Sequence, residues 1–284
     1  MKVKLFIDST CDMPSEYLEK NDVGLIPLFV TFNEEQYLDF TEIRTPRLYE
    51  LVQEKKILPK TAARSTEKFI EEFDNALKSG YDNVVYISIS GFFSSGYQNA
   101  CVAAENFEGK VFIHDSRNLS SGEGLQLIHA VRMVKEGKSG QEIVDKLKEI
   151  SSRVRSQFAV ETLEYLYKGG RCSQTSYILG QGFKIKPIIR VVDGKMIVYK
   201  KPIGKMVNAL NRLISIFEED LKNNNVELGT VMITHSMADK SCEYLFNELK
   251  KIIPEKNIMI TEAGCVVSSH CGKGTIGILY IVNK

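Results

Sequence analysis

The sequence predicts an α/β protein of two domains, the first with a mostly parallel sheet flanked by helices and the second with a mixed sheet. Short apolar runs alternate with helical patterns through the first half of the chain, which is typical of crossover units and a parallel sheet. In the second half, Asp193-Gly194 lies between two apolar runs and predicts an antiparallel hairpin. A length of 284 residues is enough for two cores.

The composition narrows the class of protein. The chain is 43% hydrophobic and 26% charged, the balance of a soluble globular protein. A net charge of +1 argues against a dedicated nucleic-acid binder, which normally carries a concentrated basic face. No apolar stretch approaches the roughly 18 residues of a membrane span, and the first apolar run meets Asp8 too early for a secretory signal. The six cysteines are scattered without a C-x-x-C pair, so we expect a cytoplasmic protein without a disulfide framework or a common zinc motif.

The elements of the first half can be placed in order. We expect strands at residues 3–7, 24–31, 83–88 and 110–114. Helical patterns begin at Pro46 behind a Thr45 N-cap, at Thr66 behind Ser65, at Ser94 and at Ser120, and another helix spans residues 139–153. Ligands of parallel sheets bind at the carboxyl ends of the strands. Asp8, residues 88–95 and Asp115 would all lie at that edge.

The second half changes character after a boundary that we place near residue 156, giving domains at residues 1–156 and 157–284. A short strand from Gln157 and a helical turn at residues 161–168 come first. We then expect strands at residues 185–192, 196–200, 230–234, 258–262 and 275–282, with helices at residues 205–223 and 238–252. This order predicts a mixed sheet with helices.

Two interpretations fit the polar cluster Asp8-Ser9-Thr10-Cys11-Asp12, which follows the first strand. Paired carboxylates there could bind magnesium, which would make the protein a metal-dependent phosphoryl-transfer enzyme using Asp8 and Asp12. Alternatively, the cluster forms a turn that caps a helix starting near Pro14. We favour the turn, because the two acids are four positions apart and no matching acid cluster follows downstream.

Two further clusters, at residues 61–65 and 88–98, place hydroxyl groups before predicted helices. Hydroxyls and backbone N–H groups at a helix start can bind a phosphate or carboxylate, and they can equally act only as caps, here from Ser65 and Ser94. Phe92 and Phe93 stand in the same turn as Ser94. An anion site walled by phenylalanines suits an amphiphile better than a nucleotide.

A fourth cluster, at residues 264–274, carries His270 between glycines. His270 could be a catalytic base, a metal ligand or a hydrogen-bond donor to an anion. Cys265, His270 and Cys271 are too few and too oddly spaced for a zinc site. A Cys–His nucleophilic pair is disfavoured, because adjacent residues of an extended segment point to opposite faces. The chain also lacks a G-x-x-x-x-G-K-[ST] loop and a G-x-G-x-x-G after the first strand, so nothing indicates bound ATP or NAD.

These clusters, in this order, resemble the bacterial DegV family over nearly the whole chain. The matching segments are Asp8-Ser9-Thr10 with Asp12, Thr61 with Ser65, Ser94 with Tyr97-Gln98 and Ala100, Asp115-Ser116 with Gly122 and Gly124, Lys168-Gly169-Gly170-Arg171, Lys186-Pro187-Ile188, and Gly264 with His270, Gly272 and Gly274. Ala62-Ala63-Arg64 departs from the Ser-Gln-Pro that the family usually has.

The resemblance implies two α/β domains with one long-chain fatty acid, such as palmitate or oleate, buried between them. It implies that the Thr61 and Ser94 hydroxyls hold the carboxylate, with His270 and Arg171 nearby from the second domain. It also implies a non-catalytic carrier without a metal or cofactor. Family members serve as the FakB subunit of bacterial fatty acid kinase, in phospholipid metabolism, and present the carboxylate to a separate kinase that makes the acyl phosphate.

The residue chemistry agrees with a carrier. Thr61 and Ser94 can donate hydroxyl protons to a carboxylate, and Arg171 or a protonated His270 would strengthen the bonds. We expect Phe93 to line the pocket. Further candidates for the wall around the tail are residues 24–31, Phe92, Ile178 and Leu179.

Overall fold

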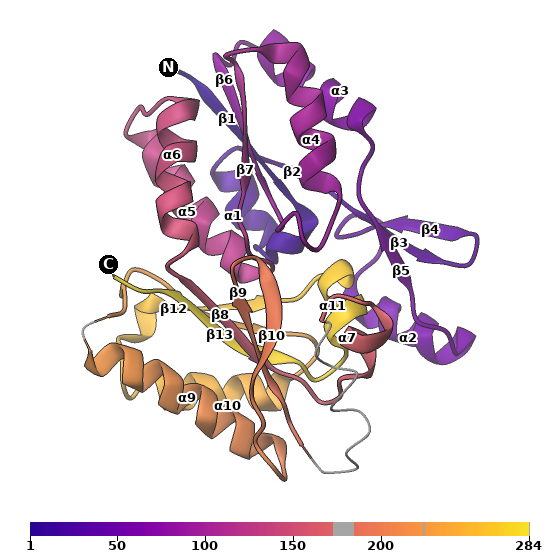
Figure 1. Cartoon of the computed structure of the whole chain (residues 1–284), viewed down its shortest axis with the longest axis vertical. Coiled ribbons are helices and arrows are strands. Elements are labelled where there is room, and N and C mark those ends of the chain that lie inside the picture. Colours follow the sequence, from indigo (N-terminus) through magenta and orange to yellow (C-terminus); the bar gives the residue numbers. More distant parts are fainter. Residues whose placement is uncertain (173–184, 224, 284) are drawn as a thin grey trace.

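The structure is a computed structural model that describes residues 1–172, 185–223 and 225–283. Two lobes, each built around one β-sheet, are stacked along the long axis of the molecule, and a smaller sheet extends from the side (Figure 1). The N-terminus lies at the far end of the first lobe, whereas the C-terminus lies near the junction of the lobes. The predicted α/β class with one parallel and one mixed sheet is confirmed.

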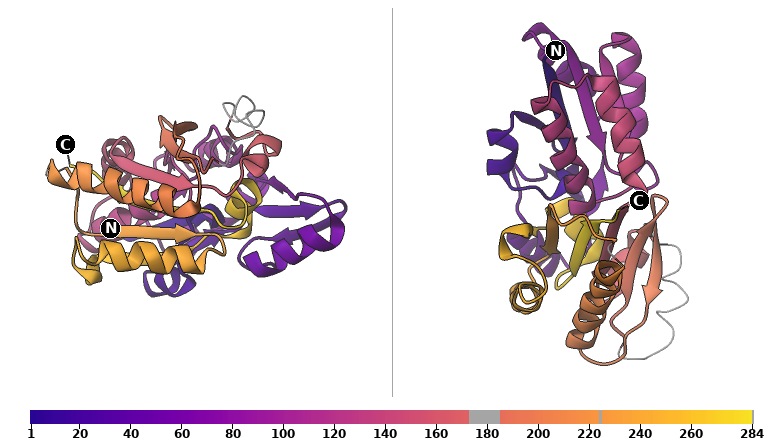
Figure 2. Two further views of the ribbon diagram at one scale, coloured as in Figure 1. Left: turned by 90° about the horizontal axis from the view of Figure 1, so that it is seen from below. Right: turned by 90° about the vertical axis from the view of Figure 1, so that its left-hand side faces the viewer.

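The first lobe contains a four-stranded, all-parallel sheet in the order β2-β1-β6-β7. Its strands are β1 (Val3–Asp8), β2 (Val23–Ile26), β6 (Asn83–Ser88) and β7 (Val111–Asp115). One face is covered by α3 (Thr66–Lys78) and α4 (Gly96–Ala104), with the short η2 (Glu105–Phe107) behind α4. The other face is covered by α1 (Ser15–Lys20), α5 (Ser121–Lys135) and α6 (Gly140–Ser151) (Figure 2).

Burial explains why these segments form a central sheet. All six residues of β6 are buried, as a strand covered on both faces requires. The aromatic side chains Phe69, Phe73 and Tyr86 pack under α3 with ring centroids 5.0 to 6.4 Å apart. On the opposite face, α6 begins with a capping box in which the Ser139 and Glu142 side chains bind each other's backbone N–H groups. The helix expected at residues 139–153 therefore starts where the sequence predicts.

The single strand expected at residues 24–31 is wrong. It divides at Pro27-Leu28 into β2 and β3 (Phe29–Phe32), which belong to different sheets. Proline has no N–H group for a sheet ladder, so it favours an interruption. The side sheet has the order β4-β3-β5, is antiparallel, and carries α2 (Thr45–Lys55). Neither β4 (Glu35–Leu38) nor β5 (Lys60–Ala62) was predicted.

Thr45 is not an N-cap as expected. The N-cap of α2 is Arg44, and Thr45 is the first residue of the helix. The Thr45 hydroxyl donates instead to the Ala263 carbonyl oxygen at 2.6 Å. Its side chain thus ties the side sheet to the second lobe.

The second lobe contains a mixed six-stranded sheet in the order β10-β9-β8-β13-β11-β12. Its strands are β8 (Val154–Ala159), β9 (Ile188–Val192), β10 (Lys195–Lys200), β11 (Val231–His235), β12 (Ile258–Glu262) and β13 (Ile276–Ile281). Two helices, α9 (Met206–Lys222) and α10 (Asp239–Leu249), cover one face, and the turn η3 (Glu255–Asn257) precedes β12. Asp193 and Gly194 turn the β9–β10 hairpin with φ values of 49° and 79°, so that prediction is confirmed. The boundary proposed near residue 156 falls within β8 and stays a prediction.

Segments of both lobes meet at α11 (Cys265–Cys271), which contacts α7 (Glu164–Lys168) and η1 (Ser9–Cys11). The extended segment expected at residues 265–274 is wrong, because α11 is helical. Two carboxylates from the first half of the chain stabilise the N-terminal end of α11. Asp12 accepts from the Gly264 N–H at 2.8 Å, and Asp39 accepts from the Cys265 N–H at 2.8 Å and the Val266 N–H at 3.3 Å. Tertiary contacts therefore supply the cap that the local sequence lacks.

Within residues 1–172, 185–223 and 225–283, no helix has both the length and the apolarity to cross a membrane.

Candidate functional site

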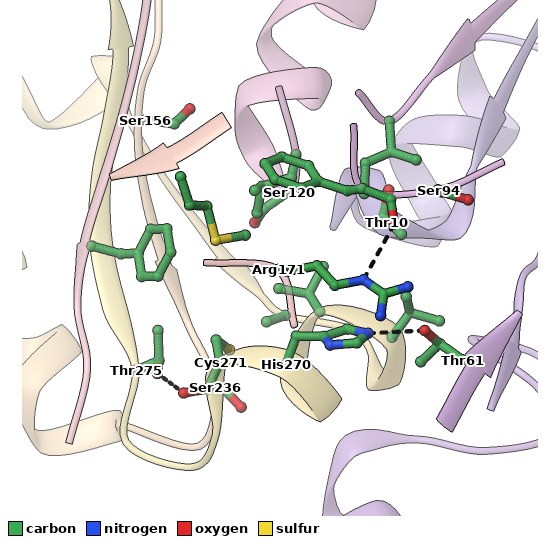
Figure 3. Close-up of a pocket in the computed structure, with 18 of the residues that line it drawn as sticks. Thr10, Thr61, Ser94, Ser120, Ser156, Arg171, Ser236, His270, Cys271 and Thr275 are labelled. Atoms are coloured by element: carbon green, nitrogen blue, oxygen red, sulfur yellow. Dashed lines mark hydrogen bonds between the residues drawn. The ribbon is translucent and has the colours of Figure 1, made fainter. Parts of the chain in front are cut away.

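A cavity of about 370 Å³ lies between the two lobes. Its walls come from the carboxyl-end loops of the parallel sheet, from β5, from α11 and from the inner face of the six-stranded sheet (Figure 3). This volume is within the range of small-molecule sites. The position agrees with the expectation that ligands bind at the carboxyl ends of parallel strands.

The structure brings together the four polar residues that the sequence singled out. Thr61, Ser94, Arg171 and His270 all line this cavity, and Figure 3 shows them on the same side of it. They come from four different elements. Thr61 lies on β5 rather than in a turn, Ser94 precedes α4, Arg171 follows α7, and His270 lies on α11. The buried side chain of Phe93 lines the cavity next to them.

His270 and Thr61 form the central contact of this polar group. The His270 Nε2 atom lies 2.8 Å from the Thr61 Oγ1 atom. Burial, and then the charge of Arg171, lowers the pKa of His270 to about 4, so the imidazole is neutral at neutral pH. The positive charge at this site therefore belongs to Arg171. The other ring nitrogen of His270, Nδ1, is buried and has no hydrogen-bond partner among the described residues.

Gly169 and Gly170, which precede Arg171, are each glycine for a different structural reason. A Cβ atom on Gly169 would lie 2.4 Å from His270 Nδ1, so only glycine lets the imidazole pack against the end of α7. Gly170 has a φ of +67°, the left-handed conformation that ends many helices and favours glycine. Arg171 Nη1 then donates to the Gly169 carbonyl at 2.7 Å, and Nε donates to the Phe93 carbonyl at 3.4 Å.

Ser94 is part of the start of α4. Its Oγ accepts from the Gly96 N–H at 3.1 Å, but the N-cap of α4 is Ser95, which makes no side-chain capping bond. The N-cap role predicted for Ser94 is therefore wrong, and Ser65 occupies the N-cap position of α3 without a side-chain capping bond. The Ser94 side chain lines the same cavity as Arg171 and His270, and its hydroxyl can still donate a proton.

Apolar side chains from both lobes form much of the remaining wall, together with hydroxyl side chains such as those of Ser120, Ser156 and Ser236. Leu28 is the one member of residues 24–31 that lines the cavity. Phe92 was a wrong candidate, because its side chain is 58% exposed and packs under the Lys195 ammonium at 4.3 Å. Ile178 and Leu179 lie outside the described residues. Sequence reasoning missed the wall of the second lobe, which includes Phe158, Leu166, Met196, Val266, Val267 and Leu279. These residues follow ordinary core periodicity, so no sequence signal separates them from a core.

The carboxylates of Asp8 and Asp12 are engaged in structural hydrogen bonds. Asp8 accepts from the N–H groups of Thr10 and Ile89, both at 2.9 Å, and thereby caps η1. Asp12 accepts from the Ser120 hydroxyl and from Gly264 N–H. The described part of the chain contains no group of three or more His, Cys, Asp or Glu placed to hold a metal ion. The turn interpretation of this cluster agrees with the structure, although Asp8 caps η1 rather than α1.

Sequence reasoning also missed Glu123, which lies fully buried in α5 behind Thr10. Thr10 Oγ1 lies 2.5 Å from Asp8 Oδ1 and 3.1 Å from Glu123 Oε2. One hydroxyl proton cannot serve two carboxylates. Asp8 accepts four hydrogen bonds, whereas Glu123 Oε1 has no partner among the described residues. Burial, followed by the charge of Asp8, raises the pKa of Glu123 well above its ordinary value. Burial therefore favours the neutral form of Glu123, and in that form Glu123 would donate to Thr10 Oγ1.

Comparison with known proteins identifies the family. The family model described as "Uncharacterised protein, DegV family" matches residues 2–283. The chain belongs to the DegV family. A DegV domain-containing protein of Clostridium acetobutylicum is 33% identical over 282 residues, which cover 99% of this chain and 98% of that protein.

Solved structures of other DegV proteins have the same fold. The structure reported for fatty acid binding of a DegV family protein from Thermus thermophilus is 27% identical, covers 100% of both chains and has a TM-score of 0.91. A stearic acid-binding protein from Eubacterium ventriosum is 26% identical, covers 99% of this chain and 98% of its own, and has a TM-score of 0.82.

Proposed function

We propose that this protein binds a single long-chain fatty acid in the cavity between its lobes and presents the carboxylate to a separate fatty acid kinase. One observation carries the proposal: Thr61, Ser94, Arg171 and His270 gather on one side of a cavity whose other walls are largely apolar. A polar end joined to an apolar body is the shape of an amphiphile. Fatty acid binding by the Thermus thermophilus and Eubacterium ventriosum relatives supports the same ligand class.

The energetics favour tight binding of an apolar tail. Burying each methylene is worth roughly 0.8 kcal/mol, so a chain of palmitate length contributes on the order of 10 kcal/mol before association costs. Palmitate and oleate are the ligands that we propose. Their chains would lie against the apolar wall formed by Leu28, Phe93, Phe158 and Leu166.

The carboxylate needs donors to replace its lost hydration. We assign the hydroxyls of Thr61 and Ser94 and the guanidinium of Arg171 as its hydrogen-bond donors. His270 completes the set through Nε2, the ring nitrogen that contacts Thr61 Oγ1, because a bound carboxylate beside it would favour the imidazolium form. Hydrogen bonds that involve ionised groups are stronger than neutral ones, so these contacts would fix which end of the ligand reaches the polar side.

The role that we propose is that of a carrier rather than an enzyme. Cys271 lines the cavity next to His270, but burial raises the pKa of its thiol to about 12. A neutral thiol beside a neutral imidazole is a poor nucleophile. The phosphoryl-transfer step would therefore come from the partner kinase, which we expect to meet the carrier in the cytoplasm. We propose a carrier of two domains, residues 1–156 and 157–284.

The test is denaturing extraction of the purified protein followed by mass spectrometry of the extract. We expect one fatty acid for each chain, and a Thr61→Val, Ser94→Ala double variant should retain much less. The kinase role is tested separately by measuring acyl phosphate formation when the loaded carrier is mixed with a fatty acid kinase. A protein that is empty, and stays empty after incubation with palmitate and oleate, would contradict the proposal. A loaded protein that supports no acyl phosphate formation would contradict the kinase role alone.

A further inference from the structure

A second depression, of about 260 Å³, also lies where the two lobes meet. The first lobe contributes Arg117 and Asn118 after β7, and Ser151 and Ser152 at the end of α6. The second lobe contributes Val154 and Arg155 of β8, Arg190 of β9 and the tip of the β9–β10 hairpin, which reaches the base of the first lobe in Figure 1. The volume is just below the usual range for small-molecule sites, which indicates a ligand of a few heavy atoms.

Positive charge predominates among the residues of this depression. Arg117, Arg155 and Arg190 line it, and Asp193 supplies the one carboxylate among its lining residues. The Asp193 side chain is 81% exposed, and its Oδ1 lies 3.6 Å from Arg117 Nη2. Three arginines and one aspartate leave a formal excess of two positive charges at this depression, although the whole chain carries a net charge of only +1.

Among the described residues, few groups accept from the guanidinium donors of Arg117 and Arg155. A guanidinium has five N–H donors. Arg155 uses one of them, from Nη1 to the Ser152 carbonyl at 3.1 Å, and Arg117 uses Nη2 for the Asp193 carbonyl at 3.3 Å. Arg190 donates Nε and Nη2 to Gln157 Oε1 and stacks 3.7 Å from the Tyr199 ring. Arg190 is thus fixed in advance, while Arg117 and Arg155 keep most of their donors.

The loop that carries Arg117 is held in place by specific contacts. Arg117 has a φ of +50°, a conformation that long side chains rarely adopt. Asp115 Oδ1 accepts from the Arg117 N–H at 2.8 Å and stabilises this turn. Residues in sparsely populated conformations concentrate at ligand sites, where the surrounding structure enforces them. The loop therefore holds a charged side chain where Gly or Asn would be less strained.

We propose that this depression is an anion site that takes a small free phosphoryl anion, with diphosphate as the best fit. The planar guanidinium fork matches phosphate oxygens two at a time, and two such groups, those of Arg117 and Arg155, match the two phosphoryl groups of diphosphate. The anion would bridge Arg117 of the first lobe and Arg155 of the second. Its site is separate from the cavity described above but shares a wall with it, because Asn118 Oδ1 accepts from Ser156 Oγ at 2.6 Å and Ser156 lines that cavity.

Isothermal titration calorimetry of the full chain at low ionic strength, with sodium diphosphate and then orthophosphate, tests this site. We expect one diphosphate for each chain and weaker binding of orthophosphate. The Arg117→Gln, Arg155→Gln double variant should weaken diphosphate binding at least ten-fold. Arg190 is left intact because it also holds Gln157. The matched control is Arg47→Gln on α2, since the Arg47 side chain is 51% exposed, like that of Arg117, and it should bind diphosphate as the wild type does.

Three results would overturn the proposal. The first is the absence of diphosphate binding to wild-type protein, and the second is undiminished binding by the double variant. The third is binding to vesicles of anionic phospholipid without binding of free diphosphate, which would assign the patch to a membrane surface instead. A thermal melt of each variant, with a midpoint matching the wild type, shows that lost binding is not lost folding.

Discussion

The His270 Nε2 atom lies 2.8 Å from the Thr61 Oγ1 atom, although 209 positions separate these residues along the chain. Thr61 belongs to the side sheet and His270 to a helix of the second lobe, so the contact exists only once the fold is complete. The polar side of the cavity therefore forms only when the side sheet packs against the second lobe.

Removal of the Thr61 hydroxyl should weaken fatty acid binding without unfolding the protein. We expect Thr61→Val to reduce affinity by about 10- to 100-fold, because a hydrogen bond to a charged group contributes about 1.5–3 kcal/mol. The matched control is Thr31→Val on the neighbouring strand β3, since Thr31 pairs with Lys60 and does not line the cavity. Equilibrium binding of a fluorescent fatty acid measures both. Equal loss of affinity in the two variants would contradict the role of Thr61.

Alanine substitutions of Gly169 and Gly170, at the end of α7, should have different effects. In Gly169→Ala the new Cβ atom would lie 2.4 Å from His270 Nδ1, so the imidazole must move and affinity for fatty acid should fall. In Gly170→Ala the Cβ atom meets nothing within 4 Å, but the φ of +67° disfavours alanine. That variant should lose about 1 kcal/mol of stability and keep its affinity. Binding and thermal melts of both variants distinguish the two effects, and the reverse pattern would refute the packing argument.

Two buried histidines should make the protein less stable in mild acid. Burial lowers the pKa of His114 and of His270 from 6.5 to about 4 in each case. Since the folded-state pKa is the lower one, folding disfavours protonation. Stability is complete above the unfolded-state pKa and falls as the pH drops from about 6.5 towards 4, by about 3 kcal/mol for each histidine. Urea unfolding of ligand-free protein across this range measures the loss, which should be smaller in His270→Gln. A free energy of unfolding that does not change with pH over this range would contradict the lowered pKa values of the two histidines.

Glu123 should have the opposite pH dependence. Its pKa is raised well above 4.5, so its contribution to stability is complete below pH 4.5 and declines as the pH rises towards the folded-state pKa. Glu123→Gln keeps a donor for Thr10 and removes the ionisable group. We expect this variant to melt about 2–4 °C higher than the wild type at pH 8, equivalent to about 1 kcal/mol, with little difference at pH 5.

Glu142→Gln is the contrasting control for Glu123. The hydrogen bonds from Ser139 to the exposed Glu142 carboxylate lower its pKa to about 2, so folding favours the ionised form. That contribution is present above the unfolded-state pKa and is lost as the pH falls towards 2. Glu142→Gln should therefore lower the melting temperature at pH 8. If both glutamine variants shift the melting temperature in the same direction, the protonated state assigned to Glu123 is wrong.

The sequence predicted most elements that depend on local signals. Apolar periodicity located β1, β6 and β7 of the parallel sheet, and Ser139 with Glu142 marked the start of α6. The errors occur where tertiary contacts replace local ones. The start of α11 is capped by Asp12 and Asp39, which are more than 220 positions away, and β5 gains its strand form from pairing with β3. Neither partner can be recognised by reading the segment alone.

Some residues of the candidate site could be identified from the sequence, and others could not. Thr61, Ser94 and His270 lie in polar clusters that residue chemistry and family resemblance both select, whereas the family resemblance alone selects Arg171. Phe158, Met196 and Leu279 line the same cavity but have the spacing of ordinary core residues. Glu123 is concealed for another reason, because a glutamate in the first turn of a helix is expected on the surface. Its burial follows from how α5 packs between the two sheets.

The bonds around α11 and β12 also determine how the interior can be reached. Asp12 and Asp39 bind the start of α11, Tyr49 binds Ser236, and Ser121 binds Thr261, all within the buried contact between the first half of the chain and the second lobe. Opening the two lobes away from each other would break all of these hydrogen bonds together and expose the buried contact to water. We therefore expect cargo to exchange through a local portal at the rim, while the lobes stay locked as one frame. The rate of exchange would then be set by the motion of a few side chains, independently of the global stability of the protein.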